Sequence, residues 1–139
     1  MINCLVLAED VLIVGNDEGV ISRVGMTDGG ELGNLGSKAG EMIHRGGITG
    51  LQVTGKDKQW LWSASYDCSV KLWCLETLCC LAVLVGHTNP IRSLCVDGGR
   101  VVSGDYRGFL MIWEVKEILE DVRRFKAKKR DDKLSLIHI

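Results

Sequence analysis

Residues 91–115 read IRSLCV, DGG, RVVS, GDYRG and FLMIWEV in succession. Three short apolar runs, rich in β-branched and aromatic residues, are separated by clusters of Gly and Asp, the residues that tight turns require. This pattern predicts three antiparallel strands joined by short hairpin connections. The stretch therefore indicates an all-β fold.

The preceding stretch follows the same plan. Its strand-like runs lie at 48–53, 60–65, 69–73 and 80–85. Matched residues recur with a nearly constant period: Ser63 and Ser103 are 40 residues apart, Trp73 and Trp113 are 40 apart, and His44 and His87 are 43 apart. Four strands per period of about 40 residues is typical of the blades of a β-propeller.

The first part of the chain fits this frame less closely. Its strand-like runs lie at 3–7, 11–14 and 20–24. The Gly-rich stretch 27–40 shows no clear period, and we interpret it as a long connection with room for a short, irregular fourth strand. The prediction is about three four-stranded antiparallel blades, at residues 1–42, 43–85 and 86–115.

The repeat unit resembles the WD40 repeat of WD-repeat β-propellers. The resemblance covers residues 1–115, most strongly from residue 43 onward, and rests on SASYD and LWC in one unit and on GH, SGD and IWE in the next. It implies a structural tetrad in each blade, a buried hydrogen-bonded chain of Trp, Ser, His and Asp that fixes strand register. The second unit has the complete set: His44, Ser63, Asp67 and Trp73.

The third unit keeps three tetrad members, His87, Ser103 and Trp113. Arg107 stands where the Asp is expected, which predicts an incomplete network in this blade. The first unit keeps none of the four convincingly.

Asp, His and Ser together also raise the alternative of a nucleophilic triad. Their recurrence with the blade period, the Trp partner and the lack of a GxSxG motif favour the structural role. The chain has three histidines and no CxxC pair, so we expect neither a metal site nor a cofactor. We therefore expect no enzyme here, and reduced cysteines rather than disulfides.

The resemblance also implies partner-binding positions on one face of the propeller: Thr49, Tyr66, Arg92, Tyr106 and Arg107. Tyr and Arg are common hot-spot residues of interfaces, and arginines suit an acidic or phosphorylated peptide. The alternative is that the two tyrosines merely cover the rim of their blades.

These features predict a non-catalytic scaffold or adaptor that presents propeller loops to a protein or peptide, in the cytoplasm or, alternatively, the nucleus. The rival function is the regulatory or substrate-recognition tail of a larger enzyme, such as a ubiquitin-ligase receptor, a kinase or an exchange factor. A composition of 46% hydrophobic and 25% charged residues excludes a disordered chain. No apolar run is long enough to cross a membrane, and the net charge of −1 does not favour nucleic acid as a partner.

Residues 116–133 carry eight Lys or Arg against five Asp or Glu. Apolar residues at helical spacing between 115 and 125 predict a short amphipathic helix. The basic run 123–130 fits a partner-docking segment, a nuclear localisation signal or a contact with nucleic acid. We favour a solvated charged linker, because nearby Asp and Glu dilute the positive charge.

The last six residues, LSLIHI at 134–139, match the translation of a transposon-adapter end used in sequencing libraries. We interpret them as an adapter-derived artefact, with a natural apolar tail as the alternative. Two and two-thirds blades do not close a propeller and leave unpaired sheet edges. We therefore expect a truncated fragment whose missing blades belong to the same full-length chain, with a second chain that supplies them as the alternative.

Overall fold

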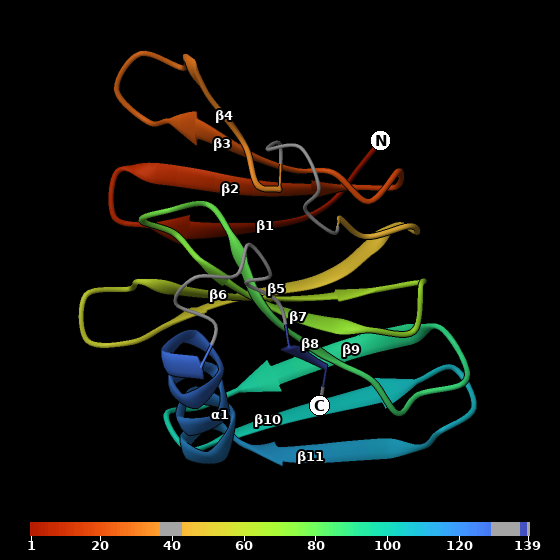
Figure 1. Cartoon of the computed structure of the whole chain (residues 1–139). Coiled ribbons are helices and arrows are strands. Elements are labelled where there is room, and N and C mark those ends of the chain that lie inside the picture. The colour runs from red at the N-terminus through yellow and green to blue at the C-terminus, as the bar shows by residue number, and fades with distance from the viewer. Residues whose placement is uncertain (37–42, 129–136, 139) are drawn as a thin grey trace.

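The structure, a computed structural model, describes residues 1–36, 43–128 and 137–138. Its main strands form three antiparallel sheets that lie next to one another (Figure 1). The first sheet contains β1 (Ile2–Ala8), β2 (Val11–Asn16), β3 (Ile21–Gly25) and β4 (Glu31–Asn34). The second contains β5 (Ile48–Thr54), β6 (Trp60–Ser65), β7 (Val70–Cys74) and β8 (Cys80–Leu84). The third contains β9 (Ile91–Val96), β10 (Arg100–Asp105) and β11 (Leu110–Glu114).

The predicted all-β fold of antiparallel blades is confirmed. Within the described residues the third blade has three strands, and helix α1 (Val115–Lys128) follows β11 directly. The stretch interpreted as a long connection contains β4, which pairs with β3. The connection therefore contains a short fourth strand of the first blade, for which the sequence left room.

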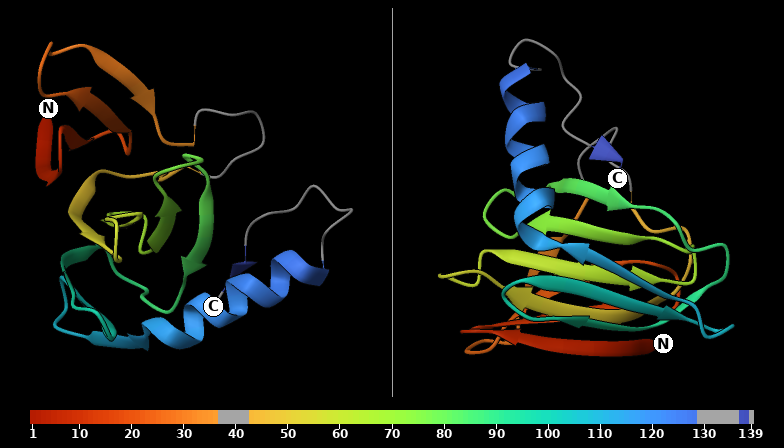
Figure 2. Two further views of the ribbon diagram at one scale, coloured as in Figure 1. Left: turned by 90° about the vertical axis from the view of Figure 1, so that its left-hand side faces the viewer. Right: turned by 90° about the horizontal axis from the view of Figure 1, so that it is seen from below.

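The first strands of the three blades, β1, β5 and β9, lie side by side, so successive sheets face one another (Figure 2). Between the first two blades the core includes Ile13, Ile48 and Trp73. Between the second and third blades it includes Trp62 and Ile91. The second blade is covered on both faces, which buries most of β6, β7 and β8.

Helix α1 confirms the predicted amphipathic helix. It begins where the backbone N–H of Val115 donates to the carbonyl of Gly99, over 3.0 Å. Val115, Ile118 and Val122 are buried in the core shared by the second and third blades. The apolar face of the helix is therefore packed on the blades rather than solvated, and its charged side faces outward. No helix in the described ranges is long and apolar enough to span a membrane.

The end of the chain is described only in part. Ile137 and His138 form a two-residue strand, β12, that runs parallel to β8 opposite Ala82 and Val83. The ranges 129–136 and 139 lie outside the described residues. The adapter-derived origin of 134–139 therefore stays a prediction, as does the role of the basic residues after 128.

Candidate interaction surface

The second blade contains a continuous hydrogen-bonded chain of four side chains. The indole N–H of Trp73 donates to Ser63 Oγ over 2.8 Å, and Ser63 Oγ lies 2.6 Å from His44 Nε2. His44 Nδ1 lies 2.9 Å from Asp67 Oδ2. The four residues come from β7, β6, the segment before β5 and the β6–β7 turn. The chain therefore joins β6 and β7 to the segment before β5 and to the β6–β7 turn.

The protonation states in this chain follow from burial and hydrogen bonding. Burial lowers the pKa of His44, against the opposing effect of Asp67. A neutral His44 donates from Nδ1 to Asp67 and accepts the Ser63 hydroxyl at Nε2. Burial disfavours ionisation of Asp67, but hydrogen bonds from His44, Ser69 and the Arg45 backbone outweigh it and hold its pKa well below the usual range. The carboxylate thus stays charged and fixes the β6–β7 turn.

The same trio does not have the geometry of a nucleophilic site. Ser63 and His44 are buried, so no solvent-exposed atom of the pair faces a substrate. The Ser63 oxygen already accepts the Trp73 N–H while its proton is directed at His44. A serine nucleophile needs access to a carbonyl and an adjacent group that stabilises the oxyanion. The arrangement fits a structural network.

In the third blade the acid comes from another position, and among the described residues Trp113 makes no hydrogen bond to Ser103, so the four-residue chain is not complete. His87 Nδ1 lies 3.0 Å from Asp105 Oδ2, and His87 Nε2 lies 2.7 Å from Ser103 Oγ. Asp105 lies two residues before Arg107, the position that matches Asp67 in the repeat. The sequence comparison missed it because it required the acid at a fixed position, whereas the carboxylate only has to reach His87.

Asp105 also organises the turn that follows it. Its Oδ1 accepts the backbone N–H groups of Arg107 at 2.8 Å and Phe109 at 3.1 Å. Burial disfavours its charge, but the bonds from His87 and these two amides outweigh it and lower the pKa of Asp105. The His87 and Trp113 rings pack edge to face, with centroids 6.3 Å apart.

The first blade has a similar turn, held by a side-chain oxygen that accepts two backbone N–H groups. Asn16 Oδ1 accepts the backbone N–H groups of Glu18 at 2.9 Å and Val20 at 3.0 Å, the same spacing that Asp105 uses. This similarity is visible in the sequence when the turns are compared instead of the tetrads, because VGNDEG at 14–19 aligns with SGDYRG at 103–108. An asparagine amide can cap the turn without carrying a charge.

Two of the predicted partner-binding residues are in direct contact. Tyr66 and Tyr106 lie in the β6–β7 and β10–β11 turns, at one end of neighbouring blades. Their hydroxyl oxygens are 2.5 Å apart, and their ring centroids are 5.4 Å apart. The bond to Tyr106 raises the pKa of Tyr66. The side chains remain 47% and 49% exposed, so the pair forms a surface rather than a core.

Arginines border this tyrosine pair. The Arg92 guanidinium carbon lies 5.4 Å from the centroid of the Tyr106 ring, within the range of a cation–π contact. Arg107 follows Tyr106 in the same turn and is exposed. We call Tyr66, Arg92, Tyr106 and Arg107 the tyrosine–arginine surface.

Thr49 does not join this surface. It lies in β5 and is only partly exposed, and its Oγ1 is buried without a hydrogen-bond partner among the described residues. Phe109 and Leu110, which the sequence did not single out, lie just beyond Tyr106 and are 63% and 67% exposed. Their counterparts one repeat earlier, Ser69 and Val70, are buried, so the repeat pattern did not indicate an exposed apolar pair at this position.

No group of three His, Cys, Asp or Glu side chains in the described part of the chain is arranged to hold a metal ion. Cys4, Cys68, Cys74 and Cys95 carry free thiols.

These features define a propeller repeat protein: antiparallel blades, a His–Asp pair in two successive units and a repeat of 40 residues. The sequence pattern of the family described as "WD domain, G-beta repeat" matches residues 40–74 and 78–114, more than half of the chain. The chain belongs to the WD40 repeat family.

Comparison with known proteins identifies similar repeats in larger proteins. Human "Pre-mRNA-processing factor 17" is 28% identical over 89 residues, which covers 62% of this chain and 15% of that protein. "Transcription initiation factor TFIID subunit 5" of Encephalitozoon cuniculi is 41% identical over 63 residues, covering 45% and 11%. The chain thus spans less than a fifth of either relative. The computationally designed Ika4 protein has a similar structure, with a TM-score of 0.71 and 25% identity over 83% of this chain and 66% of that one.

Proposed function

We propose that this chain is a non-catalytic protein-interaction module whose tyrosine–arginine surface binds a peptide segment of a partner. The observation that carries the proposal is the contact between Tyr66 and Tyr106, which joins the turns of two blades and leaves both rings half exposed. Two aromatic rings fixed in place lose little conformational entropy on binding, which is why tyrosines serve as interface anchors.

The charges beside the tyrosines favour an acidic or phosphorylated partner. Arg92 already lies over one ring, and Arg107 is exposed in the adjoining turn. A guanidinium group binds carboxylate or phosphate oxygens with two parallel hydrogen bonds. The buried His–Asp pairs hold the two turns, so the surface is available without a change of backbone.

The relatives support a nuclear setting for this module. Their names assign them to pre-mRNA processing and to transcription initiation. We therefore propose a role in a nuclear protein assembly. These names give no support to a cytoplasmic location.

Selection from a displayed peptide library tests the binding proposal without assuming a partner. The full chain and its Tyr66→Ser/Tyr106→Ser variant are immobilised in parallel. We expect the full chain alone to enrich peptides, and these to be rich in Asp and Glu. Synthetic copies then bind with a Kd raised about tenfold by Arg92→Gln, as for the loss of one charge-assisted bond.

Arg100→Gln is the matched control, because Arg100 is an exposed arginine that pairs with Glu114 outside this surface. It leaves the Kd unchanged. Phosphoserine versions of the selected peptides distinguish phosphorylated from acidic partners. The proposal fails if no peptide is enriched, or if the tyrosine double variant enriches the same peptides as the full chain.

A further inference from the structure

A second candidate site lies between the first and second blades, at the end opposite the tyrosine–arginine surface. Successive turns of an antiparallel sheet alternate between its two ends. The β1–β2 and β5–β6 turns therefore lie opposite the β6–β7 turn that carries Tyr66. Between them is a pocket of about 410 Å³, including its opening to solvent. Its lining residues are Ala8, Glu9, Val11, Ile13, Arg23, Asp57, Lys58 and Leu75.

The pocket combines an apolar wall with four charged side chains. Val11, Ile13 and Leu75 provide the apolar wall. Two of the charged side chains are cationic, Arg23 and Lys58, and two are anionic, Glu9 and Asp57. Among the described residues, none of the four makes an ion pair. Apolar walls with a few convergent polar groups are typical of ligand sites.

One N–H donor of the Arg23 guanidinium, in the wall of this pocket, has no acceptor among the described residues. Arg23 reaches inward from β3, and its Nη2 donates to the carbonyl of Leu32 over 2.5 Å. Its Nε is buried and has no hydrogen-bond partner in the part of the chain that the structure describes. A buried donor without an acceptor is costly, and a small shift of the Arg23 side chain would let a carboxylate accept from Nε and a neighbouring amino group together.

The two turns that border the pocket are held in unusual backbone conformations. Glu9 has φ 58° and Lys58 has φ 51°, both in the left-handed region that non-glycine residues seldom adopt. The Lys58 N–H donates to the Gly55 carbonyl over 3.1 Å, which closes the β5–β6 turn. Strained positions of this kind cluster at sites where a side chain must be aimed.

We propose that this pocket binds one carboxylate side chain of a partner peptide, with an adjoining apolar side chain packed on Val11 and Leu75. Arg23 and Lys58 attract the carboxylate. Glu9 and Asp57 lie in the same lining and repel a second negative charge, so a single carboxylate is preferred over a phosphate dianion. This site is separate from the tyrosine–arginine surface and does not depend on it.

Titration of the full chain with the acetylated, amidated peptide Gly-Leu-Glu-Gly tests the proposal. The Arg23 Nε–H signal in a ¹H–¹⁵N spectrum is the site-specific readout. We expect a saturable shift of that signal with this peptide, and none with the Gln counterpart, with acetate or with inorganic phosphate. An equal shift with the Gln peptide, or saturation by acetate or phosphate, overturns the proposal, as does no saturable shift with the Glu peptide.

Variants of opposite expected sign separate binding from a purely structural role. Lys58→Asn removes the positive charge while keeping a residue that tolerates φ 51°, and raises the Kd about fivefold. Glu9→Asn likewise suits its backbone and lowers the Kd about twofold, because it removes a repulsion. Two changes of the same sign, or no change in either, refute the assignment.

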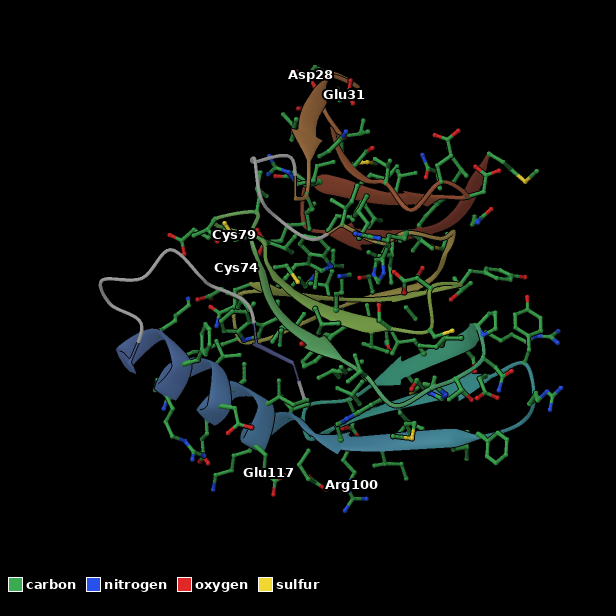
Figure 3. The ribbon with its side chains drawn as sticks, turned by 45° about the vertical axis from the view of Figure 1, so that its right-hand side comes forward. Asp28, Glu31, Cys74, Cys79, Arg100 and Glu117 are labelled. Carbon is green, nitrogen blue, oxygen red and sulfur yellow. The ribbon has the colours of Figure 1, made fainter. Side chains whose placement is uncertain are left out.

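Arg23→Gln removes the reporting Nε–H group, so binding of the Glu peptide is followed through backbone amide signals of the β1–β2 turn. We expect no saturable shift of those signals in this variant. Arg100→Gln is again the control. Arg100 lies on the third blade near Glu117, at the end of the molecule away from Asp28 and Glu31 of the first blade (Figure 3). Tyr66→Ser/Tyr106→Ser leaves this binding intact, so failure of the proposed interaction surface and failure of this pocket are distinguishable.

Discussion

In the second blade the buried histidine pairs with Asp67, and in the third it pairs with Asp105. By the 40-residue repeat, Asp105 corresponds to Ser65 and Arg107 corresponds to Asp67. Ser65 Oγ accepts the backbone N–H of Asp67 over 3.0 Å, while Asp105 Oδ1 accepts that of Arg107 over 2.8 Å. The two blades therefore use different residues to bind the histidine and to hold the backbone of the turn.

This difference between the second and third blades shows which contacts a blade needs and which sequence positions can vary. A carboxylate must reach His Nδ1, and a side-chain oxygen must hold the amide two residues along the turn. In the second blade two residues meet these needs, and in the third Asp105 meets both. Moving the acid leaves the turn position free for Arg107, which is exposed beside Tyr106. The substitution thus changes the surface without removing the His–Asp pair.

The same two blades also differ in what covers them. Val70 in the second blade is 0% exposed, whereas its counterpart Leu110 in the third is 67% exposed. The register places Leu110 and Ile112 on the face of β11 that points away from the second blade, beside Val102 of β10. Similar apolar strand sequences thus reach opposite burial because only one of them lies between two described blades.

The largest expected effect is loss of the network in the covered blade. His44→Ala leaves the Ser63 hydroxyl and the Asp67 carboxylate without their buried partner, and lowers the free energy of unfolding by about 3 kcal/mol. Urea unfolding of the full chain measures it. Arg45→Ala is the control, because only the backbone of Arg45 bonds to Asp67. A loss below about 1 kcal/mol for His44→Ala would mean that the network adds little to stability.

An intermediate effect comes from exchanging the arrangement of one blade for that of the other. Asp105→Ser removes the acid from His87 and lowers Tm by several degrees. Adding Arg107→Asp to that variant rebuilds the Ser65 and Asp67 pattern in the third blade and recovers most of the loss. Thermal unfolding of the single and double variants measures both. No recovery in the double variant would show that the two positions are not equivalent.

The smallest expected effect concerns one backbone position of the turn. Cys68 has φ 72°, and the matching residues of the other two blades are Gly19 at φ 89° and Gly108 at φ 88°. Cys68→Gly relieves the cost of a side chain in the left-handed region and raises stability by about 1 kcal/mol.

Gly108→Ala is the reverse control for this comparison. Nothing lies within 4 Å of the added Cβ, so the loss of about 1 kcal/mol reflects backbone conformation alone. Equilibrium unfolding of both variants gives the two values. If Cys68→Gly is neutral or destabilising, the thiol rather than the backbone determines the preference at this turn.

The four residues predicted for the second-blade network stand at the spacing that the family pattern requires, and in the structure they are hydrogen bonded to one another. Sequence reasoning missed Asp105, because that residue lies off the expected position and only the folded turn brings it to His87. It also missed the pocket around Arg23, since the lining residues come from four separate stretches, at 8–13, 23, 57–58 and 75. Nothing in a local pattern joins them.

The sequence by itself determined the strands, the turns and the period of the blades. Alternating apolar residues and turn-forming Gly and Asp act over a few neighbours, and their preferences can be read without knowing what lies opposite. Only the tertiary structure decided which carboxylate meets which histidine and that Val115, Ile118 and Val122 of α1 are covered by two blades. It also decided that the Nε of Arg23 is buried without a partner among the described residues. Each of these depends on contacts between residues far apart in the chain, whose geometry is fixed when the blades pack against one another.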